Sequence, residues 1–140
     1  MDLRWLDASD VDAVLAASAL FDAPAVETWA RELLEQPNHH LCIADLDAEP
    51  AGFVTGIEMT HPDKGTEMFL YELGVDEPSR GRGVAKALVR ALIARAEARG
   101  CYGVWTLTER ANTAALATYR STSPDEESDE VMLGWTLRAR

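Results

Sequence analysis

The stretch from residue 68 to residue 100 constrains the fold more than any other part of the chain. Met68–Val75 is nearly all apolar, as expected of a central strand that is covered on both faces. A loop with two glycines follows, and Gly83–Arg99 then has the apolar spacing of an amphipathic helix that ends at Gly100. A buried strand that leads through a glycine loop into a helix is typical of a mixed α/β domain.

The rest of the chain alternates predicted strands and helices around this unit. We expect further strands at residues 3–6, 41–46, 52–59, 102–108 and 131–137, and further helices at 9–20, 23–36 and 113–119. The turn-rich Asp47–Pro50 joins two of these strands and predicts a hairpin. The long helix predicts a parallel pair between the strand before it and the strand after it.

Length and charge exclude several classes of protein. The chain has 140 residues, near the commonest domain size, so we expect one domain spanning residues 1–140. Its formal net charge is −11, whereas a domain that binds duplex DNA needs a dominant basic face. Nucleic acid is therefore not an expected partner.

The cysteine spacing and the lack of long apolar runs indicate where in the cell the protein is expected. Cys42 and Cys101 form no CxxC motif, so neither a disulfide framework nor a zinc site is predicted. His39, His40 and His61 have no acid or cysteine at ligand spacing, and we interpret them as turn residues, with no metal. The first residues lack a basic start followed by an apolar run, and no run of about eighteen apolar residues occurs. We expect a cytoplasmic protein without a membrane partner.

The charge is unevenly distributed along the chain. Residues 1–79 carry 17 acidic and 3 basic residues, whereas residues 80–110 carry 7 basic and 2 acidic ones. Taken alone, an arginine-rich segment is more often a solvated helix face than a binding site.

The loop at residues 80–85 gives this basic segment a specific interpretation. A strand that opens into a helix presents unpaired backbone N–H groups, with the positive end of the helix dipole behind them. Gly81 and Gly83 let a phosphate approach the backbone, and Arg80 and Arg82 add positive charge. The loop lacks the Gly-Lys-Ser/Thr of a P-loop and the third glycine of a dinucleotide fingerprint. It predicts an anion-binding site of another kind.

Glu72 is a candidate functional residue from its strand position. Alternation puts it on one face with Met68, Leu70 and Gly74, where a buried charge is costly unless it has a partner or a task. Two interpretations stay open: Glu72 binds a substrate ammonium or takes its proton, or it pairs with a buried arginine.

The loop also resembles a known motif. Residues 80–85 read Arg-x-x-Gly-x-Ala, which is similar to the acetyl-CoA-binding motif of the GNAT N-acetyltransferase superfamily. The spacing of Asn112, Ala115 and Tyr119 resembles the superfamily's helix after its fifth strand. The run Phe69–Val75, the acid Glu109 and the ending 130–133 look like the small aminoglycoside 3-N-acetyltransferase branch. The resemblance covers roughly residues 30–137 of the printed sequence.

This resemblance implies a fold and a cofactor site. The fold would be a GNAT-type mixed, mostly antiparallel central sheet with a splayed parallel strand pair, flanked by about four helices. Acetyl-CoA would be the co-substrate, and no metal would be needed. The residues implied in cofactor binding are Arg80, Gly81, Arg82, Gly83, Val84 and Ala85 for the pyrophosphate, Leu73, Gly74 and Val75 for pantetheine, and Asn112 on the later helix.

The resemblance also implies catalytic roles. Tyr119 would protonate the leaving thiolate, and the Leu73 amide would polarise the acetyl carbonyl. Glu72 and Glu109 would bind or deprotonate a small cationic amine. Aminoglycosides are the leading candidate acceptor, followed by a polyamine, an amino sugar or an amino-acid derivative. A homodimer is compatible with this resemblance.

One departure from the family pattern keeps a second hypothesis open. Most of the superfamily continues after the helix tyrosine with a Gly-Phe step into another strand, but here Arg120–Glu127 follows. The alternative function is a catalytically idle acyl-CoA-binding sensor or interaction domain.

Overall fold

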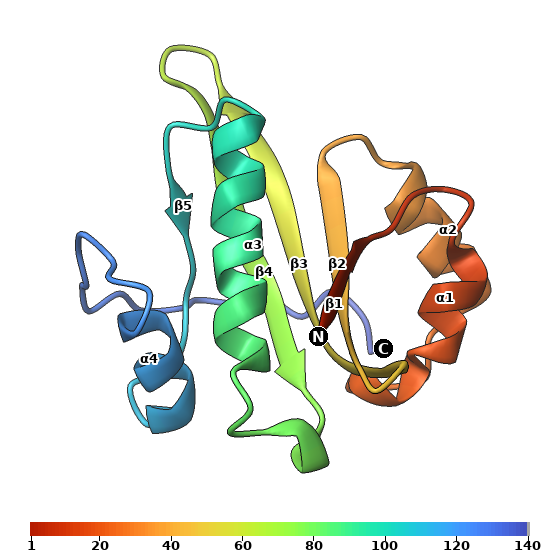
Figure 1. Ribbon diagram of the computed structural model, residues 1–140. Helices are drawn as coiled ribbons and strands as arrows, with labels where there is room; N and C mark the ends of the chain where they lie inside the picture. Colours follow the sequence, from red (N-terminus) through yellow and green to blue (C-terminus); the bar gives the residue numbers. More distant parts are fainter. Residues whose placement is uncertain (140) are drawn as a thin grey trace.

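The computed structural model describes residues 1–139 and confirms the mixed α/β class (Figure 1). The strands are β1 (Asp2–Trp5), β2 (His39–Leu46), β3 (Glu49–His61), β4 (Gly65–Val75) and β5 (Val104–Trp105). The helices are α1 (Val11–Ala16), α2 (Glu27–Glu35), α3 (Val84–Ala98) and α4 (Thr113–Arg120), with 3-10 turns at Ser18–Leu20 and Glu77–Ser79. The sheet order follows the chain, and only β4 and β5 are parallel.

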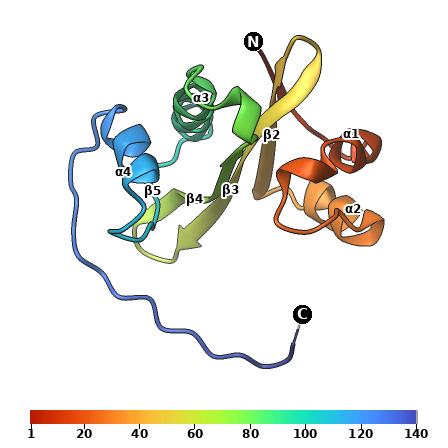
Figure 2. The ribbon, with the colours of Figure 1, turned by 90° about the horizontal axis from the view of Figure 1, so that it is seen from below.

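Helices cover the two faces of the sheet. Helix α3 packs on one face, and α1 and α2 pack on the other beside β2 and β3 (Figures 1 and 2). The approach of α3 is so close that a Cβ added at Gly56 would lie 2.6 Å from Leu92 Cδ1. Among the described residues no helix combines the length and the apolarity needed to span a bilayer.

The predicted hairpin is confirmed, and its strands are longer than expected. Asp47 and Ala48 adopt φ of 52° and 66° at the turn. The prediction of turn positions for the histidines is wrong, because His39 and His40 begin β2 and His61 ends β3. Strand pairing places His40 Nε2 2.7 Å from Glu58 Oε2 and His61 Nε2 3.1 Å from a carboxylate oxygen of Glu67.

Strand β4 contains a β-bulge that changes the predicted face of Glu72. Thr55 of β3 lies opposite Glu72 and Gly56 lies opposite Leu70, so Tyr71 is the extra residue. Leu73 therefore returns to the α3 face with Met68 and Leu70, while Glu72 shares the opposite face with Gly74. The expectation that Glu72 shares a face with Met68 and Leu70 is wrong, because simple alternation ends at the bulge.

Two predicted strands differ from the structure. Strand β5 pairs with β4 only at Val104 and Trp105, because the Thr106 hydroxyl then donates to the Leu70 carbonyl oxygen at 3.0 Å in place of a backbone ladder. The strand predicted at residues 131–137 is wrong for the single chain. That segment is extended and exposed and leaves α4 along a path away from β5, so within residues 1–139 it pairs with no strand (Figure 2).

Candidate active site

The loop between β4 and α3 has the geometry of an anion-binding site. Gly81 and Gly83 adopt φ of 75° and 82°, a left-handed conformation that favours glycine, and Gly83 is the N-cap residue of α3. A Cβ at either glycine would meet no atom within 4 Å among the described residues. Within residues 1–139, the backbone N–H groups of residues 81–86 make no hydrogen bond to protein atoms. They are available to phosphate oxygens.

One edge of β4 is open next to this loop. Residues 73–75 pair with β3 on one side, at Val54, Phe53 and Gly52. On the other side β5 pairs only with Met68 and Phe69. In the part of the chain that the structure describes, no strand pairs with the β5-facing edge of residues 71–75. An extended, amide-containing ligand can pair there as an added strand would.

Tyr119 lies on α4 beside this opening. Its half-buried ring packs against the core cluster that includes α3 and β4. Burial raises the pKa of the Tyr119 hydroxyl, and the Thr106 side chain acts in the opposite direction. The Thr106 hydroxyl donates to the Leu70 carbonyl oxygen where β4 and β5 separate. A phenol held protonated at this position can donate a proton at neutral pH.

Asn112 has a structural role at the start of α4. Its Oδ1 accepts a hydrogen bond from the Ala115 backbone N–H at 3.1 Å, which caps the helix. This cap explains the Asn–Ala spacing of the motif. Of the Asn112 side chain, only Oδ1 takes part in the cap. Cofactor binding by Asn112 stays a prediction that concerns its Nδ2 amide.

Glu72 lies across from a second carboxylate that sequence reasoning missed. Glu72 is exposed in the single chain, so the expectation of a buried charge at this position is wrong, because the bulge turns the side chain away from the α3 core. Neighbouring protein atoms still shield its carboxyl from part of the solvent and raise its pKa, and the negative charge of Asp22 raises it further. The buried Thr55 accepts a hydrogen bond from the Glu72 backbone N–H at 3.0 Å, which fixes the bulge below this carboxyl. Among the ion pairs of residues 1–139 none involves Glu72, so the interpretation that it pairs with a buried arginine is wrong. Two acidic side chains on this side of the sheet favour a cation as the ligand.

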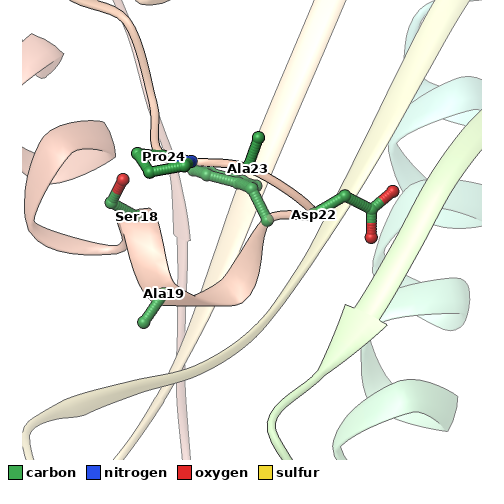
Figure 3. A pocket seen from close by; sticks show the side chains of 6 residues that line it. Ser18, Ala19, Asp22, Ala23 and Pro24 are labelled. Carbon is green, nitrogen blue, oxygen red and sulfur yellow. The ribbon is translucent and has the colours of Figure 1, made fainter.

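Asp22 comes from a loop that Gly74 allows to approach the sheet. A Cβ at Gly74 would lie 2.6 Å from Phe53 Cε1 and 3.5 Å from the Leu20 carbonyl oxygen. The carboxylate of Asp22 points away from Ser18 and Pro24, toward the β4 side of the loop (Figure 3). A surface hollow beside it is lined by Ser18, Ala19, Phe21, Asp22, Ala23 and Pro24. In the sequence, Asp22 stands out only through Asp-x-Pro before a predicted helix. That pattern is common where helices begin, so it does not indicate a functional acid.

Glu109 comes from a different part of the fold than the other two carboxylates. It is exposed in the loop after β5, and its carbonyl oxygen accepts a hydrogen bond from the Asn112 N–H at 2.9 Å. The structure therefore places Glu109 at the entrance to α4, near the other end of the helix that carries Tyr119.

Comparison with known proteins gives one family. The model of the acetyltransferase (GNAT) family matches residues 5–122. Acetyltransferase SG1711 of Sodalis glossinidius is 35% identical over 92 residues, which are 66% of this chain and 64% of that protein. A mycothiol acetyltransferase of Mycobacterium ulcerans is 31% identical over 105 residues, 75% of this chain and 32% of that protein. The chain thus spans less than two thirds of the length of these relatives.

Solved structures share the fold. An aminoglycoside acetyltransferase from an uncultured soil metagenomic sample, in complex with sisomicin, superposes with a TM-score of 0.90 at 22% identity, over 98% of this chain and 96% of that one. An aminoglycoside N-acetyltransferase in complex with CoA gives a TM-score of 0.78 at 20% identity, over 98% and 95% of the two chains. With the family model covering most of its length, the chain belongs to the acetyltransferase (GNAT) family.

Proposed function

We propose that this domain transfers an acetyl group from acetyl-CoA to a primary amine of a small cationic acceptor, with an aminoglycoside as the leading candidate. The observation that carries the proposal is the opening between β4 and β5. A loop rich in free N–H groups lies at one end of it, Tyr119 lies beside it, and two carboxylates lie on the face opposite α3. Family membership and the aminoglycoside acetyltransferases among the structural neighbours support this function.

The residues present fit acetyl-CoA, which supplies the activated acetyl thioester. The N–H groups of residues 81–86 would bind its pyrophosphate, and the open edge of Leu73–Val75 would pair with the amides of its pantetheine arm. Arg80 and Arg82 would add charge, and Arg82 is held loosely by the exposed Asp47 at 3.8 Å. The Leu73 N–H would donate to the acetyl carbonyl oxygen as negative charge develops on it.

The acidic pair would bind and deprotonate the acceptor. An alkyl amine arrives mostly as an ammonium ion, which two carboxylates attract. Because its pKa is raised, the Glu72 carboxylate is a better proton acceptor than an ordinary surface glutamate, and it would take the ammonium proton before attack. Glu109 is a second candidate base, from the opposite side of the opening.

Tyr119 would complete the reaction. When the carbon–sulfur bond breaks, the thiolate of CoA leaves with a negative charge that a nearby acid must neutralise. The Tyr119 hydroxyl, kept protonated by burial, would donate that proton.

The test is acetyl transfer to a panel of amines. The protein is incubated with acetyl-CoA and, in separate reactions, an aminoglycoside, a polyamine, an amino sugar and an amino-acid amide, and products are identified by mass. At least one cationic amine is expected to gain one acetyl group. Tight acetyl-CoA binding without any acetylated amine would instead support the alternative function, an acyl-CoA-binding sensor.

The sensor alternative is favoured by one observation. Residues 121–139 form no helix or strand, so the acceptor side lacks the further strands that follow the helix tyrosine in most of the superfamily. Tyr119→Phe separates the two functions, since only an enzyme has turnover that this variant can lose.

A further inference from the structure

We propose that Glu127 is a positioning residue, which binds Arg110 and Arg120 at the same time and so holds α4, with Tyr119, at the opening between β4 and β5. For catalysis this role rests on the proposed function, in which Tyr119 donates a proton to the leaving thiolate. Glu127 itself lies in the loop after α4 and touches none of the groups that would react.

Helix α4 has little packing that could fix its position. It is eight residues long, and none of these residues is fully buried. Its contact with the core runs through Tyr119, whose partly buried ring packs against the cluster that includes α3 and β4. An isolated helix shorter than about 12–15 residues is marginal in water, so α4 needs support from outside itself. The place of Tyr119 therefore depends on what holds the helix ends.

One carboxylate connects both ends of α4. Arg120, the last residue of the helix, donates to Glu127 twice, from Nε to Oε1 at 2.8 Å and from Nη2 to Oε2 at 2.9 Å. Arg110, which precedes the helix, donates from Nη1 to Glu127 Oε2 at 2.9 Å and also pairs with Asp129. The loop that carries Glu127 accordingly lies beside α4 (Figures 1 and 2). Glu127 thus closes a bridge from one end of the helix to the other.

The start of the same loop is bonded to the last turn of α4. The Ser121 hydroxyl donates to the Thr118 carbonyl oxygen at 2.6 Å, and the Thr122 hydroxyl donates to the Tyr119 carbonyl oxygen at 2.6 Å. These bonds satisfy carbonyl groups that a helix end leaves without a partner. The backbone of Tyr119 is therefore tied directly to the loop that carries Glu127.

The geometry of the bridge is what lets exposed ion pairs hold a helix. The side chains of Arg110, Glu127 and Arg120 are between 42% and 54% exposed, and an isolated ion pair at such a position contributes little. A bidentate arginine–carboxylate pair within a network is the exception. Hydrogen bonds from Arg120 and Arg110 lower the pKa of the Glu127 carboxyl to about 2, so the bridge keeps its charge in mild acid.

The first test is hydrogen exchange of the full chain in wild type and Glu127→Gln. Glutamine keeps the shape of the side chain, but one acceptor oxygen becomes an amide nitrogen that cannot accept from a guanidinium. The backbone amides of α4 are expected to exchange about tenfold faster or more, while those of α3 keep their rates because the opening is local. Glu126→Gln is the matched control, since Glu126 is exposed and makes no ion pair within residues 1–139. It is expected to change neither helix.

The second test is kinetic and separates positioning from a general loss of stability. In Glu127→Gln, kcat for acetylation of the amine should fall about tenfold, with the KM for acetyl-CoA within about twofold of wild type. In a Tyr119→Phe background, the same substitution should change kcat by less than about twofold, because the proton donor that it positions is already missing.

Each failure has its own signature. Unchanged exchange of α4 in Glu127→Gln overturns the bridge. A loss of kcat that persists in full in the Tyr119→Phe background overturns positioning through Tyr119. Absence of acetylation by wild type overturns the proposed function and with it the catalytic part of this role, while the exchange rates still decide whether Glu127 holds α4.

Discussion

Asp22 and Glu72 lie fifty positions apart in the sequence, yet the charge of Asp22 adds to partial shielding from solvent in raising the pKa of the Glu72 carboxyl. This influence depends on Gly74, whose missing side chain lets the chain near Leu20 approach β4. Because the bulge turns Glu72 toward this side of the sheet, we propose that the two carboxylates act as one site.

Asp22→Asn should change the pH dependence of acetylation. Without the negative charge, the pKa of Glu72 falls toward the value that partial shielding from solvent alone sets, so the acidic limb of the kcat/KM profile moves to lower pH. Asp12→Asn, which removes an exposed acid from α1, should leave the profile in place. An unmoved acidic limb in Asp22→Asn would remove Glu72 as the proton acceptor.

Tyr119→Phe should lower kcat by about 100-fold or more, because general acid catalysis typically contributes 10²–10⁴ in rate. Acetyl-CoA affinity should stay within about twofold, since the ring and its packing are kept. Tyr102→Phe removes the hydroxyl that donates to Glu67 at 2.8 Å, away from the opening, and should keep wild-type kcat. Equal losses in both variants would show that the effect is not specific to Tyr119.

Gly83→Ala should weaken acetyl-CoA binding about tenfold or more and cost about 1–2 kcal/mol of stability. The φ of 82° places a side chain in the left-handed region, and the added Cβ projects into the space that phosphate would occupy. Gly103→Ala is the control, because Gly103 also has open space around its Cβ position but no positive φ. Calorimetry measures the affinity, and thermal unfolding measures the stability.

The buried His40 should make folding weaker in mild acid. Burial lowers the pKa of His40 in the folded state, and Arg95, which donates to Nδ1 at 3.2 Å, acts in the same direction. Below the ordinary histidine pKa of 6.5 the unfolded chain takes up a proton that the folded chain resists. The free energy of unfolding should therefore fall as the pH decreases through this value.

His40→Gln should remove this part of the pH dependence, while His61→Gln should keep it. Denaturant unfolding at about pH 7.5 and about pH 5.5 makes the comparison. If wild type and His40→Gln lose stability in parallel between the two pH values, His40 is not the responsible group.

The sequence could predict the parts of the site that depend on local patterns. The glycine loop at residues 80–85, the hairpin turn and the amphipathic α3 are each encoded by neighbouring residues, and all three occur in the structure. The loop is predictable because an anion site needs little more than glycines before a helix.

The rest depends on contacts between distant residues. The bulge at Tyr71 follows from pairing with β3 and from the Thr55 hydroxyl, so alternation within β4 alone gives the wrong face for Glu72. Asp22 reaches the site through the packing of a loop that has no motif of its own. The apolar residues of 131–137 favour a strand, but a strand also needs an edge, and within residues 1–139 this segment pairs with none.

The most direct measurement compares kcat/KM for a cationic amine and for acetyl-CoA in wild type and Glu72→Gln. The gain of a charge-assisted hydrogen bond is about 1.5–3 kcal/mol, so kcat/KM for the amine should fall about 10- to 100-fold in the variant. The KM for acetyl-CoA should stay within about twofold, because Glu72 lies on the opposite face from α3. Equal kcat/KM for the amine in both proteins, or no acetylation of any amine by wild type, would contradict the account.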